Sequence, residues 1–189
     1  FQELLKGTLI FEMDVPTTQK VKMKLLRKNR IPVPENLHFV PINFDKDDIK
    51  QILFRAGYDP TKKSLFIWEG VTMYITEKAI NETLSFVKQN SGHDSTIAFD
   101  YLYKSVIQGK CTYYGARELA EIVKDNGEAF SFGIEEGEIQ EFLASKGYTT
   151  IVHYSPQLLE TRYLYNDKGE FFGNMYGFAC SVHARISAT

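Results

Sequence analysis

The sequence predicts a doubly wound α/β fold with a mostly parallel sheet. Short apolar runs that suit buried strands alternate with segments whose apolar residues recur at helical spacing, and the alternation is regular over the first half of the chain. Each strand-and-helix unit takes about 30 residues, which is the length of a parallel crossover unit. Because such crossovers are right-handed, we expect helices on both faces of the sheet.

Each element expected in the first half has its own local signal. Pro16 begins a helix that ends at Asn29. Asp45 is the expected N-cap of a second helix, which Gly57 closes, and Thr76 is the expected N-cap of a third. Short apolar runs predict strands at residues 9–14, 38–44, 65–69 and 95–101.

The pattern changes in the second half of the chain. The last strand follows a turn around Lys168 and Gly169, and we expect it to be antiparallel to its neighbour. The chain contains no linker, repeat or low-complexity segment, so a single domain over residues 1–189 is expected. Helices are predicted at 117–126, 135–146 and 156–165, and strands at 148–154 and 177–186.

Composition excludes several classes of protein. The 189 residues are 43% hydrophobic, and 22 Lys and Arg oppose 24 Asp and Glu, for a net charge of -2. This balance argues against a nucleic-acid partner. The stretch from Lys20 to Arg30 holds six cations, which we interpret as a solvated helix face. No apolar run approaches the roughly 18 residues of a membrane span, so no membrane partner is expected.

The cysteines and histidines predict neither disulfides nor a metal site. Cys111 and Cys180 are far apart in the sequence and do not form a CxxC pair, as is typical of reduced thiols in a cytoplasmic protein. The four histidines show no HxH or HExxH spacing.

Polar side chains stand where the predicted strands stop. Asp14 ends the first strand, Asn43 the second and Glu69 the third. Ligands of open α/β sheets bind beyond the carboxyl ends of the strands. A carboxylate there can accept both hydroxyls of a ribose, while Asn43 can meet an adenine edge and Phe44 can pack on the base. The alternative interpretation is that these residues cap helices or are solvated loop acids.

The residues around these positions resemble the leucine carboxyl methyltransferase family, and especially its bacterial branch of S-adenosylmethionine-dependent methyltransferases. The similarity is carried by FEMDVPTTQKVK at 11–22, VPINF at 40–44 and WEGVTMYIT at 68–76. It continues through IAFDY at 97–101, FGI at 132–134, FLASKGY at 142–148 and ETRY at 160–163. The motifs occur in the family's order and cover nearly the whole chain.

The resemblance implies the class I methyltransferase fold, with a final antiparallel strand, and S-adenosylmethionine as the cofactor. It places the ribose on Asp14, with Glu12 as a lesser contributor, and the adenine between Asn43 and Phe44. The family commonly has Asp at the position of Asn43, so an amide hydrogen bond here replaces a charge-assisted one. Glu69 is then near the amino-acid end of the cofactor.

The resemblance also implies that an N-terminal segment is missing. The family's first strand leads into a glycine-rich loop around the methionine part of the cofactor, whereas the motifs here begin at its second strand. Gly7 is a lone glycine and does not replace that loop. We therefore expect the C-terminal part of a methyltransferase, inactive by itself.

The expected reaction is O-methylation of a small molecule or a carboxylate. Methyl transfer from a sulfonium depends mainly on holding donor and acceptor in line, which explains why the sequence shows no catalytic triad. Tyr74, Asp100 and Tyr101 lie at or just past strand ends and are candidates for orienting a substrate. Arg162 is a candidate for binding an acceptor carboxylate.

Two alternatives to this function stay open. One is a non-catalytic α/β binding or scaffold module, and the other is a nicotinamide-dependent dehydrogenase, which would also need the absent first strand. The sequence leaves the methyl acceptor and the oligomeric state undetermined.

Overall fold

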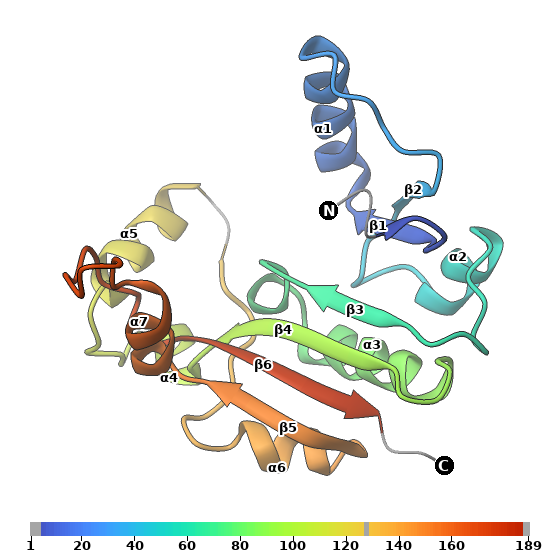
Figure 1. Ribbon diagram of the computed structural model, residues 1–189. Coiled ribbons are helices and arrows are strands. Elements are labelled where there is room, and N and C mark those ends of the chain that lie inside the picture. The colour runs from blue at the N-terminus through green and yellow to red at the C-terminus, as the bar shows by residue number, and fades with distance from the viewer. Residues whose placement is uncertain (1–4, 127–128, 187–189) are drawn as a thin grey trace. The chain divides into compact units, whose positions relative to one another are not determined.

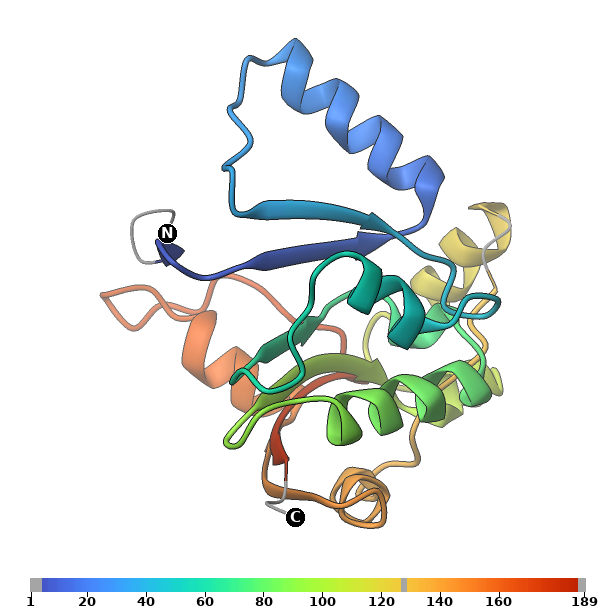
Figure 2. The same cartoon turned by 90° about the vertical axis from the view of Figure 1, so that its right-hand side faces the viewer.

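The computed structural model describes residues 5–126 and 129–186. The chain divides into two compact units, Phe1–Asp59 and Pro60–Thr189, which are treated separately below. Figure 1 labels the helices and strands of both units, and Figure 2 shows them after a quarter turn.

The smaller unit is built on a parallel strand pair. β1 (Ile10–Asp14) pairs in parallel with β2 (Leu37–Pro41). Helix α1 (Pro16–Lys28) connects them, with proline in its first turn, where a missing N–H costs nothing. It ends at Asn29, whose side chain donates to the Leu25 carbonyl, so the predicted bounds of this helix are confirmed.

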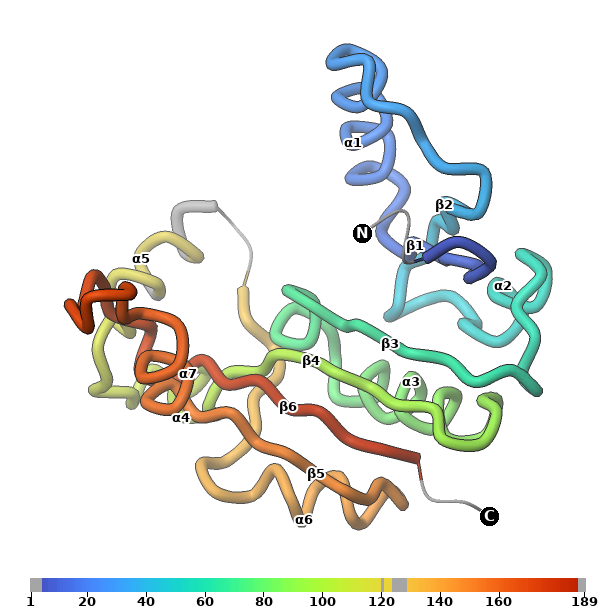
Figure 3. The backbone as a smooth tube through the Cα atoms, viewed as in Figure 1, coloured from blue at the N-terminus to red at the C-terminus, as the bar shows by residue number. Residues whose placement is uncertain are grey.

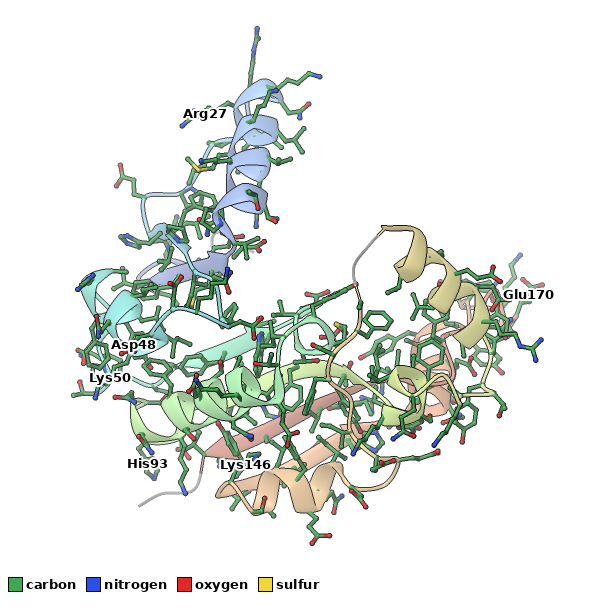
Figure 4. All side chains as sticks on the ribbon, turned by 180° about the vertical axis from the view of Figure 1, so that it is seen from behind. Arg27, Asp48, Lys50, His93, Lys146 and Glu170 are labelled. Atoms are coloured by element: carbon green, nitrogen blue, oxygen red, sulfur yellow. The ribbon has the colours of Figure 1, made fainter. Side chains whose placement is uncertain are left out.

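Helix α2 (Ile49–Arg55) begins later than the sequence predicts. Its N-cap is Asp48, whose side chain accepts from the backbone N–H groups of Lys50 and Gln51, and not Asp45. Figure 4 shows Asp48 and Lys50 at this end of the helix. The prediction was wrong because Asn43 organises a turn over residues 43–47 before the helix can begin. The preceding strand also stops at Pro41, earlier than expected.

The described part of the larger unit contains a four-stranded sheet of order β3-β4-β6-β5. β3 and β4 are parallel, whereas β6 is antiparallel to both β4 and β5. β3, β4 and β5 therefore run in one direction and the final strand runs against them, which confirms the predicted antiparallel ending. Figure 3 traces β6 between β4 and β5. The strands are Leu65–Trp68 (β3), Thr96–Leu102 (β4), Tyr148–Tyr154 (β5) and Ala179–Ile186 (β6).

Helix α3 (Glu77–Gln89) covers one face of this sheet (Figure 2). Thr76 caps it as predicted, since the Thr76 hydroxyl accepts from the Ala79 N–H. Its buried face includes Ile80, Leu84 and Val87. The other elements are the short 3-10 helix η2 (Thr72–Tyr74) and the helices α4 (Lys104–Ile107), α5 (Ala116–Asn126), α6 (Ile139–Ala144) and α7 (Pro156–Tyr163).

Two of these helices are shorter than predicted, for local reasons. The segment expected to begin α6 forms a turn at Glu135–Glu138, in which Gly137 has a φ of 87°. This left-handed conformation interrupts a helix. α7 stops at Tyr163 because the next residues form a hairpin, in which Tyr165 pairs with Phe171.

The core of the larger unit lies between α3 and the facing side chains of the sheet. Alternate residues of β4, Ile97, Phe99 and Tyr101, are buried, as are Cys180 and Val182 of β6. This period of two is the expected pattern for a strand with one face against helices.

One buried hydrogen bond fastens β5 to α3. The Tyr148 hydroxyl donates to the Leu84 carbonyl at 2.8 Å. We expect Tyr148→Phe to lower the free energy of unfolding by about 1 kcal/mol, because the ring stays packed and one hydrogen bond is lost. Urea denaturation measures the change. Tyr163→Phe is the control, since Tyr163 is 60% exposed and should leave stability unchanged. Equal effects of the two variants would contradict the prediction.

Candidate functional site

The two acids of β1 differ in their contacts. Glu12 Oε2 accepts from the Gln19 side-chain amide at 2.9 Å, and Glu12 Oε1 accepts from Lys22 Nζ at 2.6 Å. Gln19 is buried and also donates to the Glu12 carbonyl. Glu12 therefore fastens α1 to β1, and both of its carboxylate oxygens are occupied.

Asp14 is the less engaged acid of the pair. Its Oδ1 accepts from the backbone N–H of Val15 at 2.7 Å. Within the described residues, no hydrogen-bond partner is present for Oδ2, and the side chain is only partly buried. The end of β1 thus offers a carboxylate oxygen to a ligand from Asp14 rather than from Glu12.

Asn43 has a structural task at the end of the second strand. Its Oδ1 accepts from the Asp45 N–H at 3.1 Å, and its own N–H donates to Asp47 Oδ2 at 2.8 Å. These bonds close the turn ahead of α2. The sequence suggested that Asn43 offers an adenine both a donor and an acceptor. In the structure the acceptor is engaged in the turn, which leaves the donor group for a base edge.

In the larger unit, a single loop after β3 carries both Glu69 and Tyr74. Glu69 is exposed, and Tyr74 is 42% exposed with its ring 5.3 Å from that of Phe130. One predicted cofactor residue and one predicted substrate residue therefore lie on the same loop, five positions apart in the sequence.

This loop is fastened on two sides. On one side Asp100 of β4 accepts from the Gly70 N–H through its carboxylate and from the Thr72 hydroxyl through its carbonyl. On the other side Ser131 donates through its N–H to the Met73 carbonyl and through its hydroxyl to the Ile75 carbonyl. Sequence reasoning missed both sets of bonds. The adjacent Glu69 and Gly70 were the available signal, because glycine often marks a left-handed turn.

The pKa of Asp100 reflects the place of its carboxylate beside the loop that carries Glu69. Burial raises the pKa of Asp100 above its usual value, and the charge of the neighbouring Glu69 raises it further. Hydrogen bonds from the backbone N–H groups of Gly70 and of Asp100 itself lower the pKa and offset part of the shift. Asp100 was expected to orient a substrate, but its carboxylate contacts the loop.

Tyr101 faces the opposite side of the sheet from Asp100. Its side chain is 1% exposed, because β4 continues to Leu102 and does not end at Tyr101 as predicted. Its ring lies 6.1 Å from that of His153, and its hydroxyl lies beside the Cys180 thiol without a hydrogen bond of regular geometry. Burial raises the pKa of Tyr101. The structure does not bring this tyrosine to the loop that carries Glu69.

Arg162 lies on α7, with its guanidinium 5.7 Å from the centre of the Tyr154 ring. This cation–π contact orients the side chain and leaves the arginine exposed. Its role in binding an acceptor stays a prediction.

Residues 5–126 and 129–186 contain no group of three or more His, Cys, Asp or Glu side chains that could hold a metal ion. In the same residues no helix has the length and apolarity needed to cross a bilayer. Cys111 and Cys180 are unpaired.

Comparisons with known proteins show which sequences and folds this chain is similar to. Residues 2–88 match the family model of leucine carboxyl methyltransferases. YktD of Bacillus subtilis strain 168, which carries the provisional name of an S-adenosyl-L-methionine-dependent methyltransferase, is 28% identical over 166 residues. That match covers 88% of this chain and 54% of YktD, so the chain spans about half the length of this relative.

Solved structures share the fold. A protein from Thermobifida fusca, provisionally described as a methyltransferase, superposes with a TM-score of 0.59 at 16% identity, covering 95% of this chain and 64% of that one. Human N-acetylserotonin methyltransferase, solved with S-adenosylmethionine, gives a TM-score of 0.51 at 14% identity over 98% of this chain and 43% of that one. The fold is that of the class I S-adenosylmethionine-dependent methyltransferases. Within that class, residues 2–88, a little under half of the chain, are similar to the leucine carboxyl methyltransferase family.

His153 makes stability depend on pH. Burial lowers the pKa of His153 below its usual 6.5, so the folded state holds the neutral imidazole. The unfolded chain therefore binds the additional proton as the pH falls below 6.5. The contribution of neutral His153 to stability is complete above that pH and is lost as the pH falls through the lower, folded-state value. We expect His153→Gln to reduce this loss.

Urea denaturation of the two proteins between neutral and mildly acidic pH measures the difference. His93→Gln is the control for replacing a histidine at an exposed position, because the His93 side chain is 75% exposed. A His153→Gln variant that loses stability on acidification as steeply as the parent would contradict the assignment.

Proposed function

We propose that the protein is an S-adenosylmethionine-dependent methyltransferase that transfers the methyl group to an oxygen atom of a small molecule or a carboxylate. The observation that carries this proposal is that each unit has an acid beyond the end of a parallel strand: the half-buried Asp14 at the end of β1 in one unit and the exposed Glu69 after β3 in the other. Each stands where ligands of α/β folds bind, beyond the carboxyl end of a parallel strand.

The two acids suit the two polar ends of the cofactor. Asp14 accepts hydrogen bonds from the ribose hydroxyls, for which a carboxylate has enough lone pairs. Glu69 attracts the ammonium group of the methionine part. Asn43 donates to an adenine edge, and Phe44 packs beside the base. Glu12 supports Asp14 indirectly, because it holds α1 against β1.

The reaction moves one methyl group. The acceptor oxygen attacks the methyl carbon as the carbon–sulfur bond breaks, and S-adenosylhomocysteine leaves with the electron pair of that bond. A carboxylate acceptor carries no proton, so no base is required. Holding donor and acceptor in line supplies most of the rate enhancement. Tyr74 and Arg162 are the proposed acceptor-binding residues, with Arg162 suited to bidentate contact with a carboxylate. Tyr101 is 1% exposed and is therefore not proposed to contact the acceptor.

A second candidate function is binding without turnover. The observation that favours it is Asn43, which forms a turn with the oxygen that a base-binding side chain would use. A non-catalytic α/β module would bind the nucleoside but transfer no methyl group.

Cofactor binding tests the proposed acids. Calorimetry of the full-length gene product should show that S-adenosylhomocysteine binds and that Asp14→Ala weakens binding about 10-fold or more, because bonds to a charged acceptor are lost. Glu12→Gln is the matched comparison. It keeps one oxygen acceptor, for Gln19, and gives up only the exposed bond from Lys22, so binding should change less than about 3-fold. No binding to the parent protein, or equal losses in both variants, would contradict these assignments.

Methyl transfer tests turnover and the acceptor class together. The protein should move label from S-adenosylmethionine to a member of a panel of carboxylic acids and phenols. Base-labile label indicates a methyl ester and base-stable label an ether. If the acceptor is a carboxylate, Arg162→Ala should raise KM by about 10-fold with a smaller change in kcat. Binding of S-adenosylhomocysteine without transfer to any acceptor would favour the non-catalytic alternative.

A further inference from the structure

Glu69 lies between two points of attachment to β4. On its N-terminal side Trp68 pairs with Phe99 in the parallel ladder, and Trp68 is buried. On its C-terminal side the Gly70 N–H donates to the carboxylate of Asp100 at 2.9 Å. The main chain of Glu69 is therefore fixed by its two neighbours, while its own side chain stays exposed.

We propose that Asp100 is a positioning residue for the cofactor site, acting by holding the turn at Gly70 so that Glu69 faces the amino-acid end of S-adenosylmethionine. This inference rests on the proposed function and adds to it a residue that makes no contact with the ligand.

Asp100 holds this turn with two different groups. Its carboxylate accepts from Gly70, and its backbone carbonyl accepts from the Thr72 hydroxyl at 2.6 Å. Thr72 is 1% exposed, so that second bond is sheltered from water. Gly70 has a φ of 67°, a conformation that other residues rarely adopt. The turn is thus a specific structure that needs an acceptor at this place, and Asp100 supplies it.

Electrostatics favours the same role. The charge of Glu69 is among the causes that raise the pKa of Asp100, after burial, so the two acids interact electrostatically. The N–H of Gly70 offsets the charge of Asp100, whereas Glu69 has solvent on its side. Together the two acids create a negative field beyond the end of β3, which complements the ammonium group of the cofactor.

A double-mutant cycle tests whether Asp100 acts through Glu69. The measured quantity is the Kd of S-adenosylhomocysteine for the full-length gene product, by calorimetry. Asp100→Ala should weaken binding about 10-fold, and Asp100→Asn, which keeps an oxygen acceptor, less than about 3-fold. In a Glu69→Ala background, Asp100→Ala should cost less than about 2-fold, because the group that it positions is gone.

Two further variants keep the test decisive. Asp94→Asn removes an acid at the other end of β4, where asparagine tolerates the left-handed φ of 62°, and should leave the Kd unchanged. If Asp100→Ala does not fold, Thr72→Val removes the other bond to Asp100. It should weaken binding about 3-fold in the parent protein and not at all in the Glu69→Ala background.

Three results overturn the inference. If Asp100→Ala, or Thr72→Val in its place, leaves the Kd unchanged, the turn needs no such anchor. If the loss is equally large with and without Glu69, the effect is a general structural one. If the parent protein does not bind S-adenosylhomocysteine, the proposed function fails and this inference fails with it, whereas the first two results leave the proposed function standing.

Discussion

The pairing of β4 with β6 is the interaction on which the larger unit depends. The register runs from Thr96 opposite Arg185 to Leu102 opposite Ala179. Since β6 also pairs with β5, it is the strand that connects β5 to the parallel pair of β3 and β4. The buried side chains of β4 and β6 then form one apolar face for α3. A late strand inserted antiparallel thereby fixes the carboxyl ends of β3, β4 and β5 at the same edge, where the loop with Glu69 lies.

In each unit one acid is hydrogen-bonded within the fold and a second acid remains available to a ligand. In the smaller unit Glu12 is bound by Gln19 and Lys22, and Asp14 keeps an oxygen free among the described residues. In the larger unit Asp100 is bound by Gly70, and Glu69 is exposed. One acid of each pair contributes hydrogen bonds to the fold. The other is left at the strand end, where its charge can be used for a ligand.

Local signals in the sequence were sufficient for the elements that end or begin at distinctive residues. Pro16 and Thr76 start helices where predicted, and the strands predicted at 95–101 and 148–154 correspond to β4 and β5. The prediction of Asp45 as the N-cap of α2 was wrong because three acids lie close together there. The turn made by Asn43 selects Asp48 as the cap. The role of Asp100 in holding the turn at Gly70 could not be predicted from the sequence, for another reason. The bond from Gly70 to Asp100 joins residues 30 positions apart, and no local pattern specifies such a contact.

The most direct test is a crystal structure of the full-length gene product with S-adenosylhomocysteine. The predicted result has the ribose hydroxyls within hydrogen-bond distance of the Asp14 carboxylate and the ligand's ammonium group beside Glu69. The bond from Gly70 to Asp100 should be intact in that complex. A nucleoside bound away from the ends of β1 and β3, with Asp14 and Glu69 in solvent, would contradict this account.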